Sequence, residues 1–182
     1  VVQGFDQYSK DVAAYRAAGR HAIGIAVNLE PKYPASDSPE DQAATRRAHA
    51  YMNRQYLDPL FFGRYPAAMA EIFGEAWPQH TPAETAALRC APDFLAVNYY
   101  TRAVTRHAAN AWPLRASAVR QPQATYTETG WEVFEQGLAD TLAWLASHPL
   151  CNGKVGMFGP SYMGWAQFEA ATRRPSALAT MI

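Results

Sequence analysis

Three short apolar runs, separated by segments with a helical period, constrain the fold of this chain most strongly. The runs are AIGIAVNL (22–29), DFLAVNYY (93–100) and KVGMFG (154–159). Unbroken apolar runs of this length, bounded by turn residues, are typical of strands that are covered on both faces. Because helices separate them, the pattern favours a parallel sheet with right-handed crossovers. The sequence therefore predicts an α/β fold with about three main strands and flanking helices.

The helical segments have recognisable starts and stops. The clearest start is Ser38, which is followed by Pro39 at the first helical position and by Asp41 three residues after the serine. This helix is expected to run to about Phe62, with Gly63 as its stop. The remaining helices are predicted over 4–18, 131–148 and 161–174, with short proline-opened helices in 64–74 and 81–92.

The stretch 101–130 has no helical period. It contains short β-like pieces, RAVTRH (102–107) and ATYTET (124–129), and we expect a long excursion or hairpin there. The loop 30–41 is rich in Pro, Ser and Asp and is predicted to be irregular.

Composition excludes several classes of partner. The chain has 182 residues and equal numbers of basic and acidic residues, 16 each, without a basic run, so we expect no nucleic acid partner. No segment approaches the ~20 apolar residues that span a bilayer, and no signal peptide is recognisable, so we expect no membrane association and a cytoplasmic location. Cys90 and Cys151 have no metal-binding spacing. We expect no metal and no organic cofactor.

Polar side chains follow all three predicted strands. Asn28 ends the first, Asn98, Tyr99 and Tyr100 end the second, and Gly159-Pro160-Ser161 follows the third. In parallel α/β folds, ligands bind at the carboxyl ends of the strands. These residues are therefore candidate site residues, although each could simply cap its strand.

About the first three-quarters of the chain resembles a known family. The blocks IGIAVNLEPKYPASDSPEDQAATRRAHAYMNRQYLDPLFFGRYP, PDFLAVNYYTRAV and YTETGWEVFEQGL are similar to glycoside hydrolase family 1, the β-glucosidase family, over about residues 4–143. The resemblance implies a middle segment of a (β/α)8 barrel, from the helix before strand five to the helix after strand six. It also implies a small-molecule β-glucoside as substrate.

The resemblance implies a retaining mechanism with two glutamates, one acid/base and one nucleophile, about 5 Å apart. Family members carry them in Asn-Glu-Pro and Thr-Glu-Asn-Gly motifs, neither of which occurs in this sequence. Glu30 in NLEP and Glu128 in TETG lie in other blocks, so we interpret both as loop residues. Asn98 and Tyr100 match the family's residues beside the nucleophile and are predicted to bind substrate.

The last part of the chain, residues 142–182, resembles a different family. NGKVGMFGPSYMGW is similar to the nucleophile elbow of the X-Pro dipeptidyl-peptidase and cocaine-esterase group of α/β-hydrolases. The resemblance implies Ser161 as catalytic nucleophile and the backbone N–H of Tyr162 as half of an oxyanion hole. That family places its aspartate and histidine after the serine, and no histidine or aspartate follows Ser161 here.

The two resemblances together indicate a chimera. We predict a single α/β domain over 1–182, in which 1–141 is barrel-like and 142–182 is a hydrolase-like strand, elbow and helix. This last β-α unit could replace the seventh unit of the barrel. A parallel sheet of three strands leaves two edges unpaired. We therefore expect an incomplete barrel that is completed by self-association, as a homo-oligomer.

Three functions stay open from the sequence. The first, favoured by the longer resemblance, is hydrolysis of β-glucosides. The second is an esterase or amidase that uses Ser161, with a base recruited from the histidines His21, His49, His80, His107 and His148. The third is a non-catalytic chimeric fragment that binds a small ligand at the strand ends.

Overall fold

The computed structural model describes residues 2–149, 151–160 and 162–182, and the chain forms two compact units. Unit 1 is Val1–Pro122 and unit 2 is Gln123–Ile182. Their boundary falls inside the long stretch 101–130. Each unit is described by itself below, and the single domain expected over 1–182 stays a prediction.

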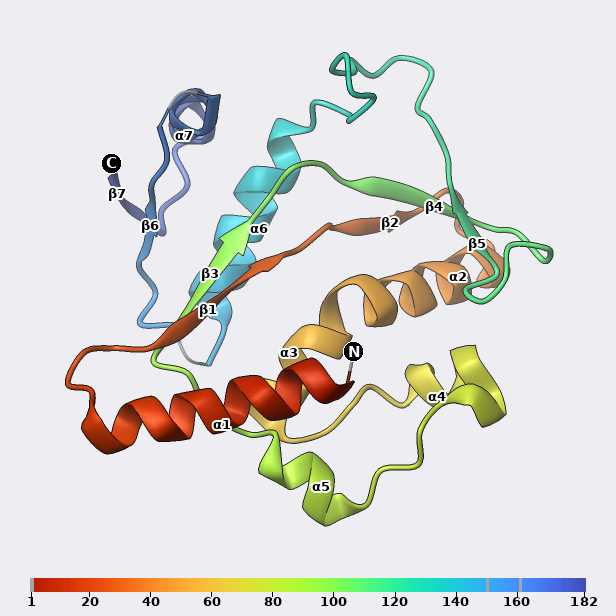
Figure 1. The fold of residues 1–182 in the computed structure, drawn as a ribbon. Coiled ribbons are helices and arrows are strands. Elements are labelled where there is room, and N and C mark those ends of the chain that lie inside the picture. The colour runs from red at the N-terminus through yellow and green to blue at the C-terminus, as the bar shows by residue number, and fades with distance from the viewer. Residues whose placement is uncertain (1, 150, 161) are drawn as a thin grey trace. The chain divides into compact units, whose positions relative to one another are not determined.

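A parallel pair of strands lies at the centre of unit 1 (Figure 1). Strands β1 (Gly24–Asn28) and β3 (Phe94–Asn98) pair in register from Gly24 opposite Phe94 to Asn28 opposite Asn98. Asp93 fixes the start of the pair, because its carboxylate accepts a hydrogen bond from the Ile23 N–H at 2.9 Å. The predicted parallel pairing of these two runs is confirmed.

A long helical segment connects the two strands. It comprises α2 (Pro39–His49), a π-helical turn η1 (Ala50–Arg54) and α3 (Gln55–Phe62). The Ser38 side chain caps the start by accepting a hydrogen bond from the Asp41 N–H at 3.2 Å. Gly63 ends it in the left-handed region, with φ of 62°. The predicted start and stop are confirmed, whereas the sequence did not predict the π-helical turn.

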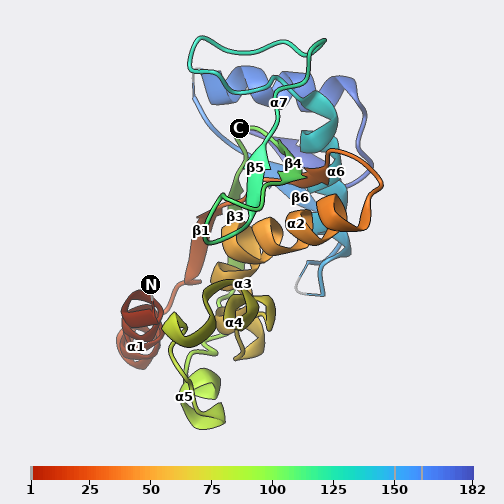
Figure 2. The same cartoon turned by 90° about the vertical axis from the view of Figure 1, so that its right-hand side faces the viewer.

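The core of unit 1 forms where α3 packs against β1, and the two views in Figures 1 and 2 agree on this arrangement. Val27 and Leu29 meet Leu57, Leu60 and Phe61 there, and all five are buried. Full burial of one such side chain stabilises the fold by about 1.5–3 kcal/mol. Helix α1 (Val2–Ala18) covers part of this core with Tyr8.

Two short helices follow, as predicted: α4 (Ala68–Phe73), which continues into the 3-10 turn η2 (Gly74–Ala76), and α5 (Pro82–Ala87). Helix α5 begins with a capping box, in which Thr81 and Glu84 bond each other's backbone N–H groups. The capping box satisfies two N–H groups that the first turn leaves without a helical acceptor.

A second sheet in unit 1 has the order β2-β4-β5. Its strands are β2 (Lys32–Pro34), β4 (Ala103–His107) and β5 (Ala116–Ala118). The expected hairpin is present and consists of β4 and β5, which pair antiparallel. Strand β2 lies in the loop 30–41, which was expected to be irregular. It is extended there because its backbone pairs in parallel with β4.

Unit 2 contains α6 (Glu135–Ser147), β6 (Val155–Met157), α7 (Tyr162–Thr172) and β7 (Leu178–Met181). An ion pair at 2.6 Å joins Arg173, the residue after α7, to Glu135 of α6. Strand β7 was not predicted, and it pairs in parallel with β6.

The α/β class and the parallel pairing of β1 with β3 are therefore confirmed. The prediction of a single sheet with three main strands is wrong for the described residues. Those residues form three small sheets, because β6 takes β7 as its partner and β2 takes β4. Within the same residues, no helix combines the length and apolar character needed to cross a membrane.

Candidate functional site

The two asparagines predicted at the strand ends meet at the carboxyl end of β1 and β3. They form the last pair of the ladder, and the Asn98 Nδ2 donates a hydrogen bond to the Asn28 Oδ1 at 2.8 Å. Both side chains are exposed. This bond fixes the orientation of each amide and leaves the Asn28 Nδ2 and the Asn98 Oδ1 facing solvent as a donor and an acceptor.

Tyr100 lies two residues beyond the end of β3. Its side chain is 53% exposed, whereas that of Tyr99 is half-buried. An exposed phenol offers an apolar ring face together with a hydroxyl that donates and accepts. The carboxyl end of this strand pair thus presents two amides and one aromatic side chain that could contact a polyhydroxylated ligand.

The backbone of the loop after β1 is held in place by a side chain that the sequence analysis did not single out. Asn53, in η1, accepts a hydrogen bond from the Glu30 N–H at 3.0 Å and donates one to the Glu30 carbonyl at 2.9 Å. The Glu30 carboxylate pairs with the ammonium of Lys32. Glu30 is therefore a fixed, half-buried loop residue. A polar residue inside a helical run was the only signal for Asn53.

His49 adds a further contact to this network, because its Nδ1 lies 2.9 Å from the Asn53 Nδ2. The two Glu30 bonds fix the Asn53 amide with Nδ2 as donor, so His49 accepts at Nδ1 and is neutral. Although His49 reaches the surface, desolvation by the protein around its ring lowers its pKa, and the charges of Arg54 and Lys32 lower it further. Asp58 opposes this shift.

The elbow in unit 2 has the close glycine contacts that a sharp strand-to-helix turn requires. A Cβ on Gly159 would lie 2.5 Å from the Met163 Cβ, and a Cβ on Gly164 would lie 3.1 Å from the Gly159 carbonyl oxygen. Ser161 itself lies outside the described residues. Tyr162 is the first residue of α7, where N–H groups lack helical acceptors.

Gln167 holds this elbow in place and was missed by the sequence reasoning. Its buried Nε2 donates to the carbonyls of Gly159 at 3.1 Å and Ile182 at 2.9 Å, and its Oε1 accepts from the Ile182 N–H at 3.1 Å. The end of β6 is thereby joined to the residue after β7. This role of Gln167 can be recognised only once β7 is seen to pair with β6.

The histidines considered as a base have other contacts. In unit 1, the ring of His80 stacks on that of Tyr65 at 5.1 Å, and His107 contacts Asp41 through its backbone N–H rather than its ring. In unit 2, the ring of His148 lies 5.5 Å from that of Trp144, and burial lowers its pKa. The ring contacts of His80 and His148 indicate structural roles for these two side chains, and a base for Ser161 stays unassigned.

Two sequence families match this chain. The model of glycosyl hydrolase family 1 matches residues 5–149, and that of the X-Pro dipeptidyl-peptidase (S15) family matches 126–182. The first match contains Asn28, Asn98 and Tyr100, and the second contains the elbow. The two matches overlap around α6.

Curated relatives are plant β-glucosidases. Beta-glucosidase 42 of Arabidopsis thaliana is 38% identical over 97 residues, which is 53% of this chain and 20% of that protein. Beta-glucosidase 6 of Oryza sativa subsp. japonica is 38% identical over 93 residues, 51% of this chain and 18% of that protein. The chain thus spans about a fifth of the length of these relatives.

Solved structures show the same fold. A β-glucosidase from Exiguobacterium marinum superimposes with a TM-score of 0.78 and 19% identity, over 97% of this chain and 46% of that chain. The family 1 β-glucosidase from Thermotoga maritima gives 0.76 and 21% identity, over 96% of this chain and 44% of that chain. Because the family 1 sequence model covers most of its length, this chain belongs to glycosyl hydrolase family 1.

Proposed function

We propose that this chain binds a β-glucoside at the carboxyl end of β1 and β3, as part of a family 1 glycoside hydrolase site. The observation that carries the proposal is the Asn98–Asn28 hydrogen bond of 2.8 Å at the end of the in-register pair. It orients an amide donor and an acceptor toward solvent, beside the exposed Tyr100. Sugar hydroxyls need such alternating donors and acceptors, and sugar C–H faces pack on aromatic rings.

The environments of Glu30 and Glu128 favour binding rather than unaided hydrolysis. Retaining hydrolysis needs two carboxyl groups about 5 Å apart, one protonated and one ionised. In unit 1, Glu30 is neutralised by Lys32 and its backbone is held by Asn53. In unit 2, Glu128 is exposed in the tight turn closed by the Thr127 N–H to Trp131 carbonyl bond of 2.8 Å. We propose that neither residue replaces the family's catalytic glutamates.

A titration tests the binding function. We expect salicin, an aryl β-glucoside, to shift side-chain amide signals of Asn28 and Asn98 in NMR spectra. Asn98→Ala should weaken binding about tenfold, because one amide is lost and its partner is left disoriented. Tyr100→Ala should weaken it similarly. Asn110→Ala, at an exposed asparagine outside this site, is the matched control. Equal affinity of Asn98→Ala and the wild type would contradict the proposal.

A second candidate function rests on the elbow. The close approach of Gly159 to Met163 and of Gly164 to Gly159 produces the turn in which hydrolases present a nucleophile. The match of this region to the S15 family supports the same interpretation. We propose that the Ser161 hydroxyl attacks the carbonyl carbon of an activated aryl ester weakly, giving its proton to water and expelling the phenolate as the acyl–oxygen bond breaks, with the Tyr162 N–H stabilising the oxyanion. Ser161→Ala should abolish cleavage of an aryl acetate, and an unchanged rate would exclude this function.

A further inference from the structure

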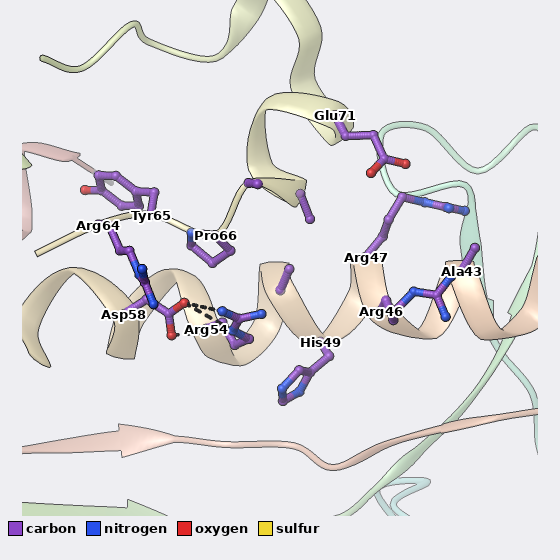
Figure 3. Close-up of a pocket in the computed structure, with 13 residues that line it drawn as sticks. Ala43, Arg46, Arg47, His49, Arg54, Asp58, Arg64, Tyr65, Pro66 and Glu71 are labelled. Atoms are coloured by element: carbon purple, nitrogen blue, oxygen red, sulfur yellow. Dashed lines mark hydrogen bonds and ion pairs between the residues drawn. The ribbon is translucent and has the colours of Figure 1, made fainter. Parts of the chain in front are cut away.

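Unit 1 contains a pocket of about 510 Å³ that is separate from the carboxyl end of the strands. It lies between the helical segment α2–η1–α3 and the residues that lead into α4 (Figure 3). Its charged lining consists of four arginines and two carboxylates, namely Arg46, Arg47, Arg54, Arg64, Asp58 and Glu71. In Figure 3, His49 points from the same helix toward the strands, whereas Arg47 points into the pocket.

Small side chains create the space. Ala43, Ala50 and Ala67 line the pocket where larger residues would fill it. A volume of this size is typical of sites for small molecules. The wall also includes Ala50 and Arg54 of the π-helical turn η1, and such turns occur often at functional sites.

Two of the arginines are fixed in place by the protein. The Arg54 guanidinium donates to the Asp58 carboxylate at 2.7 and 3.1 Å, and Asp58 is buried. The Arg47 Nε donates to the Leu114 carbonyl at 2.8 Å. Each fixed guanidinium keeps further N–H donors, since arginine has five. These two cations are therefore already positioned for an incoming acceptor.

The other two arginines lack such partners. Among the residues that the structure describes, the side chains of Arg46 and Arg64 make no hydrogen bond or ion pair. Figure 3 places Arg64 near Arg54 at one end of the pocket and Arg46 near Arg47 at the other. Like charges held together repel, and a bound anion removes this repulsion. The pocket thus has a fixed and an uncommitted cation at each end.

We propose that this pocket binds a small molecule that carries phosphate groups. Arginine forms parallel, charge-assisted hydrogen bonds to phosphate oxygens, and the doubly charged group matches the excess of cations over carboxylates. Helical rise separates Arg47 and Arg54 by roughly 10 Å, so a ligand with two linked phosphates reaches both ends better than one phosphate.

Calorimetric titration of the whole chain with pyrophosphate and with inorganic phosphate, at constant ionic strength, tests this site. We expect pyrophosphate to bind more tightly than phosphate. Arg46→Ala and Arg64→Ala should each weaken pyrophosphate binding about tenfold, through lost charge-assisted bonds. Ala43→Leu should weaken it as strongly by filling the pocket while every charge stays. Arg20→Ala, at an exposed arginine outside the pocket, is the control and should bind as the wild type.

Several outcomes would overturn the proposal. They are wild-type affinity in Arg46→Ala and Arg64→Ala, full affinity in Ala43→Leu, or an equal loss in Arg20→Ala. The last result, or equal binding of heparin in all variants, would mean that the surface attracts anions without a defined pocket. Circular dichroism of each variant confirms that it is folded.

Discussion

Asn53 and Glu30 are joined as two peptide groups in a sheet would be: the Asn53 amide accepts from the Glu30 N–H at 3.0 Å and donates to its carbonyl at 2.9 Å. A buried side chain in η1 thus fixes the backbone just after β1. The position of this loop beside Asn28 therefore depends on the helical segment and not only on the sheet.

Asn53→Ala should destabilise unit 1 by about 1–3 kcal/mol, because the Glu30 backbone groups lose both partners. Chemical denaturation with far-UV detection measures this loss. Asn110→Ala, at an exposed loop asparagine, is the control and should leave the free energy of unfolding unchanged. An Asn53→Ala variant as stable as that control would show that water replaces the amide without loss.

His49 makes stability depend on pH. Its folded pKa lies below the value of 6.5 for an unperturbed histidine, so the unfolded chain binds the proton more readily. The free energy of unfolding should therefore fall as the pH drops from above 6.5 through the folded pKa. Because protonation at Nδ1 also removes the Asn53 bond, His49→Gln should flatten this slope. The effect is small, since His49 reaches the surface. An unchanged slope in His49→Gln would assign the dependence to other groups.

Asp41 also makes stability depend on pH, in a lower pH range, because hydrogen bonds favour its charged form. Hydrogen bonds from the His107 N–H at 2.7 Å and then from the Ser36 hydroxyl at 2.7 Å hold its pKa below the usual 3.8. The stabilisation is complete above the unfolded pKa and is lost as the pH falls through the folded one. Asp41→Asn should lower the Tm at neutral pH and remove this part of the acid transition. Asp37→Asn, at an exposed neighbour, is the control.

Gly159→Ala should disrupt unit 2, because the added Cβ would lie 2.5 Å from the Met163 Cβ. Overpacking of this kind costs typically about 1–3 kcal/mol. Proteolysis kinetics at the elbow report the effect, and Pro160→Ala, at an exposed neighbour, is the control. Equal resistance of both variants would mean that α7 moves aside at little cost.

Self-association stays a prediction, and the small sheets are its physical reason. Among the described residues, β1 pairs only with β3 and β6 only with β7, so strand edges are left unpaired. Light scattering should show a mass that rises with protein concentration. A monomer at every working concentration would contradict this prediction.

Sequence reasoning located the elements whose signals are local. The Ser38 cap, the Gly63 stop and the two apolar runs of β1 and β3 all lie within a few residues of the features that reveal them. The adjacency of Asn28 and Asn98 followed from parallel pairing alone. Strands β2 and β7 were missed because three or four residues carry too little periodicity to distinguish a strand from a loop.

The polar contacts that fix the candidate site could not be predicted in the same way. Asn53 and Gln167 are buried amides whose partners lie 23 and 15 residues away in the chain. Neither sits in a recognisable motif, and their roles depend on tertiary packing. Sequence reasoning identified candidate site residues, whereas the residues that hold them in place emerged only from the fold.

The π-helical turn η1 determines how the segment α2–η1–α3 responds to the deletion of one residue. Residues in an α-helix advance by about 100° each. A π-turn holds one residue more than an α-turn, so deleting one residue from Ala50–Arg54 would convert the wide turn to an α-turn and leave the direction of α3 relative to α2 nearly unchanged. Leu57 and Leu60 would then keep their places in the core, whereas Asn53 and Arg54, which lie inside the turn, would no longer keep their present directions. A single deletion there would therefore cost the contacts of these two side chains rather than the register of the core.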